Sequence, residues 1–197
     1  TVTVSQSISV DQTTIENGGD VIVMGTPIVF TIENGTESVD MLVNGLLKAT
    51  GSPNEASPYS VNAIGTLEFG STGVYEHNQN AGGIPTSIWG TGSTALITGT
   101  TGTAPADRNQ NYYNLTFNTP GNTATGLNMG FDNNVIGGDI NIISTGTGRW
   151  QLCAPTAGDS ATVSINGNII QSGGNFSSTG SGSAAFIEIT VNGNINV

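Results

Sequence analysis

A short unit recurs along this chain: a glycine, usually beside an asparagine or aspartate, followed by a run of Ile, Val or Leu. The glycine of this unit stands at Gly19, Gly45, Gly65, Gly138, Gly167 and Gly193. Successive spacings are 26, 20, 73, 29 and 26 residues, and the interval of 73 is close to three units. The glycines therefore span seven intervals averaging about 25 residues, a period typical of one turn of a solenoid.

This period predicts an all-β fold, a right-handed parallel β-helix of about eight coils of roughly 25 residues. Two or three short strands per coil would turn alternate side chains inward, and each strand would pair with the same position of the next coil. Gly and Asn suit the corners because they accept positive φ. The alternative is a β-sandwich, which also has short alternating strands. We favour the solenoid because the unit keeps similar flanks and tight hairpin loops are not the rule.

Composition supports an ordered β-fold. Charged residues make up 9% of the sequence, whereas disordered segments combine high charge with few β-branched residues. Three segments are predicted to be loops that leave the coil: residues 51–60, 100–111 and 120–122. The low-complexity residues 171–184 fit either a coil face of small side chains or a loop.

The net charge of −11, with three basic residues in the whole chain, excludes two classes of partner. Nucleic acids and anionic membrane surfaces both need clustered cations, and Lys48, Arg108 and Arg149 are scattered. No apolar run is long enough for a transmembrane helix, so membrane insertion is not expected. Cys153 has no partner for an internal disulfide and lies in a strand-like run, which predicts a buried small side chain.

Both ends of the sequence are strand-like, at residues 1–4 and 191–197. An uncapped solenoid end exposes unpaired backbone groups. We therefore expect residues 1–197 to form one solenoid domain that is a processed piece or fragment of a longer protein, or that another chain covers at its ends. The expected partners are accordingly a second copy, by self-association, or the neighbouring coils of a longer chain.

One segment carries a more specific pattern. It consists of Tyr75-Glu76-His77-Asn78, Gly82-Gly83-Ile84-Pro85, Trp89 and Ile97-Thr98-Gly99, with Tyr113-Asn114-Leu115-Thr116-Phe117 further on. Together with the Gly-Asn-Ile units, this pattern resembles the β-helical repeat regions of large adhesin-like surface proteins exported by type IX secretion. The resemblance covers most of the chain and implies a β-helix at the cell surface. It implies no catalytic residues, and the sorting domain of that family is not among the residues of this sequence.

Residues that could carry catalysis are sparse. His77 is the single histidine and lacks both a Gly-x-Ser-x-Gly context and a second histidine for zinc, so a histidine hydrogen-bonded at a coil corner is the favoured interpretation. A polysaccharide hydrolase needs two facing carboxylates, and stacking could bring Asp20 and Asp40 onto one face. A lyase needs a cation beside paired acids, and no basic residue lies near such a pair in the sequence. We expect the protein not to be an enzyme.

Three kinds of ligand or modification site have candidates. Candidates for stacking on sugars are Tyr75, His77, Trp89, Tyr112, Tyr113 and Trp150. The alternative is that these rings pack beneath the loops. No cofactor is expected apart from Ca²⁺, for which Asp20 and Asp132 are candidates, against the alternative of ordinary turn chemistry. Ser160, in Asp159-Ser160-Ala161, resembles the short O-glycosylation motif of bacteria with type IX secretion.

These observations predict an extracellular, cell-surface module with a structural or adhesive role. In this interpretation the solenoid is a stiff rod that displays or spaces a binding surface, or a subunit of a surface filament. The alternative is a carbohydrate-binding module of a secreted polysaccharide-acting protein, with glycans as partners.

Overall fold

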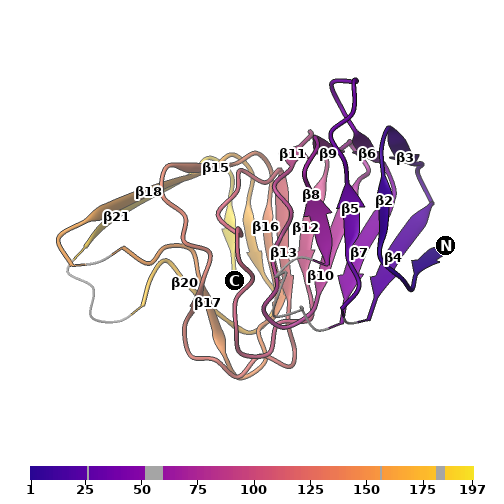
Figure 1. Cartoon of the computed structure of the whole chain (residues 1–197). Coiled ribbons are helices and arrows are strands. Elements are labelled where there is room, and N and C mark those ends of the chain that lie inside the picture. The colour runs from indigo at the N-terminus through magenta and orange to yellow at the C-terminus, as the bar shows by residue number, and fades with distance from the viewer. Residues whose placement is uncertain (26, 52–59, 156, 181–184) are drawn as a thin grey trace.

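The structure is a computed structural model that describes residues 1–25, 27–51, 60–155, 157–180 and 185–197. These residues form an all-β structure without a helix, in which the paired strands run parallel. The strands wind into a β-solenoid consistent with a right-handed parallel β-helix, which confirms the predicted fold class (Figure 1). A β-sandwich would need antiparallel strands, and the described residues form none.

One sheet, here called sheet A, runs through the whole molecule, and its strands lie side by side from the indigo N-terminal end to the yellow C-terminal end (Figure 1). Its order is β1 (Val2–Val4), β4 (Asp20–Met24), β7 (Leu46–Thr50), β10 (Val74–Asn78), β12 (Thr94–Ile97), β13 (Asn114–Asn118), β16 (Ile140–Ser144), β19 (Ile169–Gln171) and β22 (Ile195–Asn196). Each turn of the chain therefore contributes one strand to sheet A.

Shorter sheets complete the turns on the other faces. The N-terminal half has β2 (Ile8–Val10), β5 (Phe30–Ile32) and β8 (Val61–Ala63) in one sheet, and β3 (Thr13–Ile15), β6 (Met41–Val43), β9 (Leu67–Phe69) and β11 (Ile88–Trp89) in another. The C-terminal half has β14 (Leu127–Asn128), β17 (Arg149–Gln151) and β20 (Asn175–Ser177), and also β15 (Asn134–Ile136), β18 (Ser160–Ile165) and β21 (Phe186–Val191). Strands β18 and β21 extend away from the stack at the C-terminal side (Figure 1).

Alternation along sheet A builds two interior columns, because successive side chains of a strand point to opposite faces. The first column is Val21, Leu47, Tyr75, Ala95, Leu115, Ile140 and Ile169. The second is Val23, Ala49, His77, Ile97, Phe117 and Ile142, all of them fully buried. The predicted inward alternation is thus present, with one histidine inside an otherwise apolar column.

One of the six glycines that the sequence analysis assigned to the repeat does not belong to it. The position two residues before the first interior column is occupied by Gly19, Gly45, Gly73, Ser93, Tyr113, Gly138, Gly167 and Gly193. Gly65 does not belong to this series, because it precedes β9 in another sheet. The turns measured at this position are 26, 28, 20, 20, 25, 29 and 26 residues long. The two shortest turns end where Ser and Tyr replace the glycine.

Close approach of neighbouring turns, rather than a positive φ, requires glycine at this position. A Cβ at Gly45 would collide with the carbonyl oxygen of Gly19, and a Cβ at Gly193 would collide with that of Gly167. Neither Gly45 nor Gly193 has a positive φ. The expectation that these corner glycines serve φ > 0 is therefore wrong, and backbone contact between turns is the physical reason.

Beside these glycines, a ladder of side chains joins the C-terminal turns. The Oδ1 atom of Asn114 accepts the backbone N–H of Asp139 at 3.0 Å, and Oδ1 of Asp139 accepts the N–H of Asn168 at 2.7 Å. Oδ1 of Asn168 in turn accepts the N–H of Asn194 at 2.9 Å. Each rung satisfies a backbone donor that the sheet leaves free at the corner, so the ladder fixes the register between turns.

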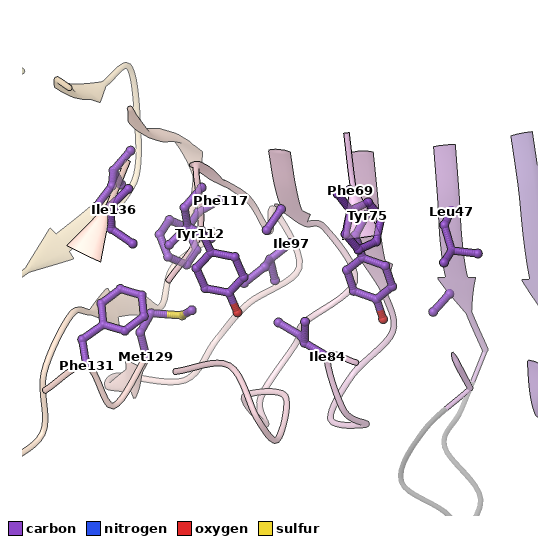
Figure 2. Packing of buried hydrophobic residues seen from close by; sticks show 14 of the residues in the cluster. Leu47, Phe69, Tyr75, Ile84, Ile97, Tyr112, Phe117, Met129, Phe131 and Ile136 are labelled. Carbon is purple, nitrogen blue, oxygen red and sulfur yellow. The ribbon is translucent and has the colours of Figure 1, made fainter. Parts of the chain in front are cut away.

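Aromatic rings fill the middle of the solenoid (Figure 2). Phe69 and Trp89 stack with ring centroids 4.6 Å apart and planes 9° from parallel. Trp89 also meets Tyr112 edge-on at 4.9 Å, and Tyr112 lies 6.3 Å from Phe131. These rings come from successive turns, so the row ties several turns together through the core.

The predicted loops have mixed outcomes. Residues 100–111 and 120–122 contain no strand, as expected, although Ala106 forms an isolated bridge to Gly83. Most of the predicted loop 51–60 lies outside the described residues. In 171–184, strand β20 supports a coil face, and 181–184 are outside the description.

Candidate functional site

His77 lies on the inner side of β10, next to the corner where that strand ends. Its Nε2 atom is 2.7 Å from the carbonyl oxygen of Ala81, and its Nδ1 atom is 3.4 Å from the hydroxyl of Tyr75. Nε2–H therefore donates to Ala81, while Nδ1 accepts from Tyr75. Burial lowers the pKa of His77 to about 4, against a smaller opposing effect of the Ala81 hydrogen bond. This is the geometry of a neutral histidine hydrogen-bonded at a coil corner.

Three aromatic candidates for sugar stacking are fully enclosed. Tyr75, Tyr112 and Trp150 are at most 1% exposed. Burial raises the pKa of both tyrosine hydroxyls, and Tyr112 donates to the carbonyl oxygen of Arg108 at 2.7 Å. The indole Nε1–H of Trp150 donates to Thr119 at 3.1 Å. Like His77, these rings have no face open to a sugar, because they are buried in the interior of the solenoid.

The other two aromatic candidates also have structural contacts. Trp89 is partly buried on the ring of Phe69, and its Nε1–H donates to Gln110 at 3.0 Å. Tyr113 lies with its ring over Gly137 and Gly138, where a Cβ on either glycine would meet the ring. The structure therefore does not assemble the six candidates into one exposed strip.

The acidic candidates lie apart and serve local structure. Asp20 begins β4 in sheet A and accepts a hydrogen bond from Thr1 at 2.6 Å. Asp40 is buried before β6, and its carboxylate accepts the backbone N–H groups of Thr66 at 2.6 Å and Gly35 at 2.7 Å. Both hydrogen bonds lower the pKa of Asp40, and the one from Thr66 has the larger effect. Asp20 therefore belongs to sheet A, whereas Asp40 precedes a strand of a different sheet.

Asp132 and Ser160 border one shallow hollow near the start of β18. The hollow has a volume of about 460 Å³, and its lining also includes Phe131, Asp159 and Ala161. Ser160 is exposed, so its hydroxyl is accessible for the predicted O-glycosylation. Within the described residues, no group of three or more His, Cys, Asp or Glu side chains is placed to hold a metal ion.

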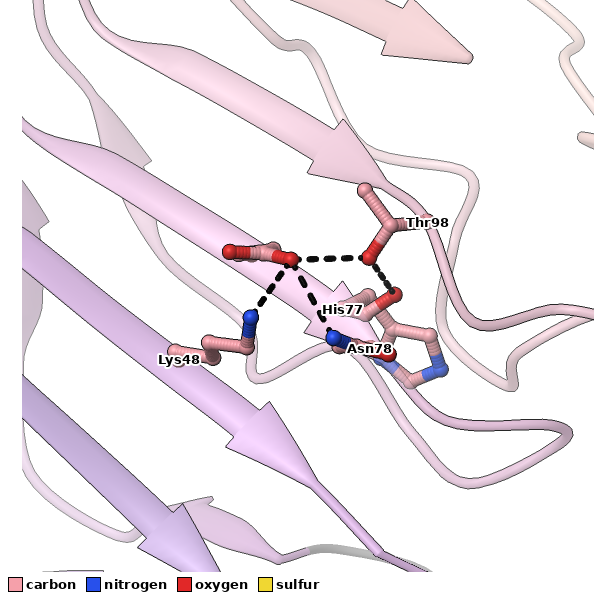
Figure 3. A network of polar contacts seen from close by, with 5 residues as sticks. Lys48, His77, Asn78 and Thr98 are labelled. Carbon is pink, nitrogen blue, oxygen red and sulfur yellow. Dashed lines mark hydrogen bonds and ion pairs between the residues drawn. The ribbon is translucent and has the colours of Figure 1, made fainter. Parts of the chain in front are cut away.

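A polar network that the sequence did not single out lies on the outer face of sheet A (Figure 3). The Nζ atom of Lys48, on β7, is 2.9 Å from Oε1 of Glu76 on the neighbouring strand β10. The same oxygen accepts the hydroxyl of Thr98 at 2.9 Å and the amide Nδ2 of Asn78 at 3.4 Å. The signal was present, because Lys48 follows Gly45 by three residues and Glu76 follows Gly73 by three. Counting Gly65 in the series concealed it.

The N-terminal edge of the solenoid carries an apolar hollow of about 370 Å³. Its lining is drawn from the first two turns and includes Val2, Val4, Ile8, Val10, Ile15 and Phe30. These side chains continue the interior of the solenoid as far as β1, and Val2 is 60% exposed. Such a surface is typical of a place where another apolar surface packs.

Comparisons with protein-family models, with curated proteins and with solved structures gave no match in any of the three. Within the described residues, no helix is long and apolar enough to cross a membrane.

Proposed function

We propose that this chain is a structural or adhesive module of the cell surface, a stiff β-solenoid that spaces or displays a binding surface outside the cell. The observation that carries the proposal is the uninterrupted nine-stranded sheet, which joins every turn from β1 to β22. At about 4.8 Å between strands, such a stack is about 40 Å long. The resemblance of residues 75–99 and 113–117 to surface adhesins supports the location.

In the filament form of this proposal, the apolar hollow at the N-terminal edge receives the C-terminal edge of a second copy. That edge presents Ile195 and Val197, which are 62% and 93% exposed. Ile195 stands in register with Ile169, so it continues the first interior column. Packing of this edge on the hollow would extend the parallel sheets from one copy into the next.

The filament form is tested by light scattering after size exclusion and by electron microscopy. We expect assemblies whose size increases with concentration, and we expect Ile8→Asp to abolish them because it places a charge in the hollow. The control is Ile88→Asp, since Ile88 is 52% exposed and lies on β11, away from the hollow. A monodisperse species of 20.0 kDa at all concentrations would refute the filament form.

The surface location is tested separately. Antibodies against the folded chain should label intact, unpermeabilised cells that produce it naturally, and protease added outside should remove the signal. Labelling that needs permeabilised cells would refute the proposed location.

A further inference from the structure

Lys48 and Asn78 both contact one carboxylate oxygen of Glu76, and these three side chains form a cluster. Oε1 of Glu76 lies 2.9 Å from Nζ of Lys48 and 3.4 Å from Nδ2 of Asn78. The two nitrogens therefore contact the same carboxylate oxygen (Figure 3). Thr98, which directly follows the next strand of sheet A, β12, donates to this oxygen at 2.9 Å and holds the carboxylate in place.

The surroundings of the cluster remove much of its water. The side chains of Lys48 and Glu76 are 23% and 14% exposed. In the same outward column, Ile22 precedes Lys48 and Leu96 follows Glu76, so an aliphatic residue flanks the pair on each side. The amine of Lys48 therefore lies against its carboxylate partner in a site that is largely shielded from solvent. A neutral lysine amine is a nucleophile.

We propose that Lys48 and Asn78 join in an intramolecular isopeptide bond, with Glu76 as the catalytic proton carrier. Nζ of Lys48 is the nucleophile, Cγ of Asn78 is the electrophile and Nδ2 of Asn78 leaves as ammonia. The carboxylate is in contact with both the attacking and the departing nitrogen, which is the placement that proton transfer between them requires.

The reaction balances without any co-reactant. The lysine ammonium gives one proton to Glu76, and the freed amine attacks Cγ of Asn78 to form a tetrahedral intermediate. Glu76 passes its proton to Nδ2, the Cγ–Nδ2 bond breaks as the carbonyl re-forms, and ammonia departs. The carboxylate then takes the remaining excess proton from Nζ and gives it to the ammonia. The products are an amide, an ammonium ion and an unchanged Glu76 carboxylate.

The bond would form a covalent cross-link between one turn of the solenoid and the next. Lys48 lies on β7 and Asn78 on β10, and these strands are adjacent in sheet A. A covalent link there resists separation of the two turns when the ends of the molecule are pulled apart or when the chain unfolds. A surface rod gains mechanical resistance from such a link.

The test exploits the fact that Lys48 is the only lysine in the chain. The purified full chain is denatured and digested with a protease that cleaves after lysine. We expect the wild-type chain to remain uncut and its intact mass to be lower than the sequence mass by one ammonia. Peptide mapping with an acid-specific protease should find Lys48 and Asn78 in one branched peptide. This map distinguishes the link from succinimide formation at Asn-Gly sites, which also loses ammonia but leaves Lys48 cleavable.

Two variants and a control complete the experiment. Glu76→Gln and Asn78→Ala should restore full cleavage at Lys48 and the unmodified mass, and circular dichroism should confirm that both are folded. Asn118→Ala changes an asparagine on β13 that lies two strands further along sheet A, and it should stay uncut like the wild type. Complete cleavage at Lys48 of a wild-type chain that was folded before it was denatured would overturn the proposal, as would a Glu76→Gln variant that is still linked.

Discussion

Replacement of Gly45 by alanine tests whether contact between turns is what selects glycine at the corner. The new Cβ would collide with the carbonyl oxygens of Gly19 and Glu16 and with the side chain of Ile15. Two of these are backbone atoms, which cannot move aside by changing a rotamer. Overpacking of this kind costs about 2 kcal/mol. The Gly19 oxygen also accepts the N–H of Leu46 at 2.9 Å, and displacing it forfeits about 1 kcal/mol more.

We therefore expect Gly45→Ala to lower the free energy of unfolding by about 3 kcal/mol. The assay is urea denaturation followed by circular dichroism, where the midpoint should fall while the m-value stays constant. Gly102→Ala is the matched control, because a Cβ at Gly102 would have no atom within 4 Å and the residue has no positive φ. The control should change stability by less than about 0.5 kcal/mol. Equal effects of the two substitutions would refute the steric explanation.

Three further predictions concern buried side chains. The pKa of His77 in the folded chain, about 4, lies below its ordinary value of 6.5, so its contribution to stability is fully present above pH 6.5. The free energy of unfolding should therefore fall by about 3 kcal/mol as the pH falls from 6.5 to 4. His77→Gln should flatten that part of a stability-versus-pH curve. The thiol of Cys153 is buried, and burial, with a smaller effect of Asp132, raises its pKa to about 11; a thiol reagent at pH 8 should react with it only in denaturant, and rapid reaction of the native protein would contradict this. Trp89→Ala should lower the free energy of unfolding by about 3 kcal/mol, because it removes the ring stacked on Phe69. The same substitution should leave glycan-array signals unchanged. Loss of a glycan signal without loss of stability would restore the sugar-binding interpretation.

The period of the fold could be predicted from glycine spacing, but the position of each turn could not. Gly45 and Gly193 mark the corner because backbone contact forbids a larger residue there. The turns that end at Ser93 and Tyr113 lack this signal, and Gly65 supplies a false one from another corner. The predicted average period was therefore right, while the predicted positions of the central turns were wrong.

The same misalignment limited the prediction of which side chains point into the solenoid and which point outward. Tyr75 and His77 were candidates for sugar stacking because aromatic faces pack on sugar rings, yet the true register turns both into the interior. The register also places Lys48 against Glu76, a pair that is 28 residues apart and invisible to any local pattern. One-residue accuracy in register is what separates an inward from an outward side chain.

The ladder from Asn114 to Asn194 gives the C-terminal turns equivalent contacts with their neighbours. Every rung offers the same acceptor to the backbone of the turn that follows it. Removal of residues 139–167 would excise one complete turn and bring Asn168 to the place that Asp139 occupies above Asn114. Removal of part of a turn would leave an acceptor facing no donor, and a shift by an odd number of residues would also reverse the inward and outward sides of a strand. Changes in the length of this molecule are thus permitted in whole turns, so duplication and deletion can lengthen or shorten it without redesigning its core.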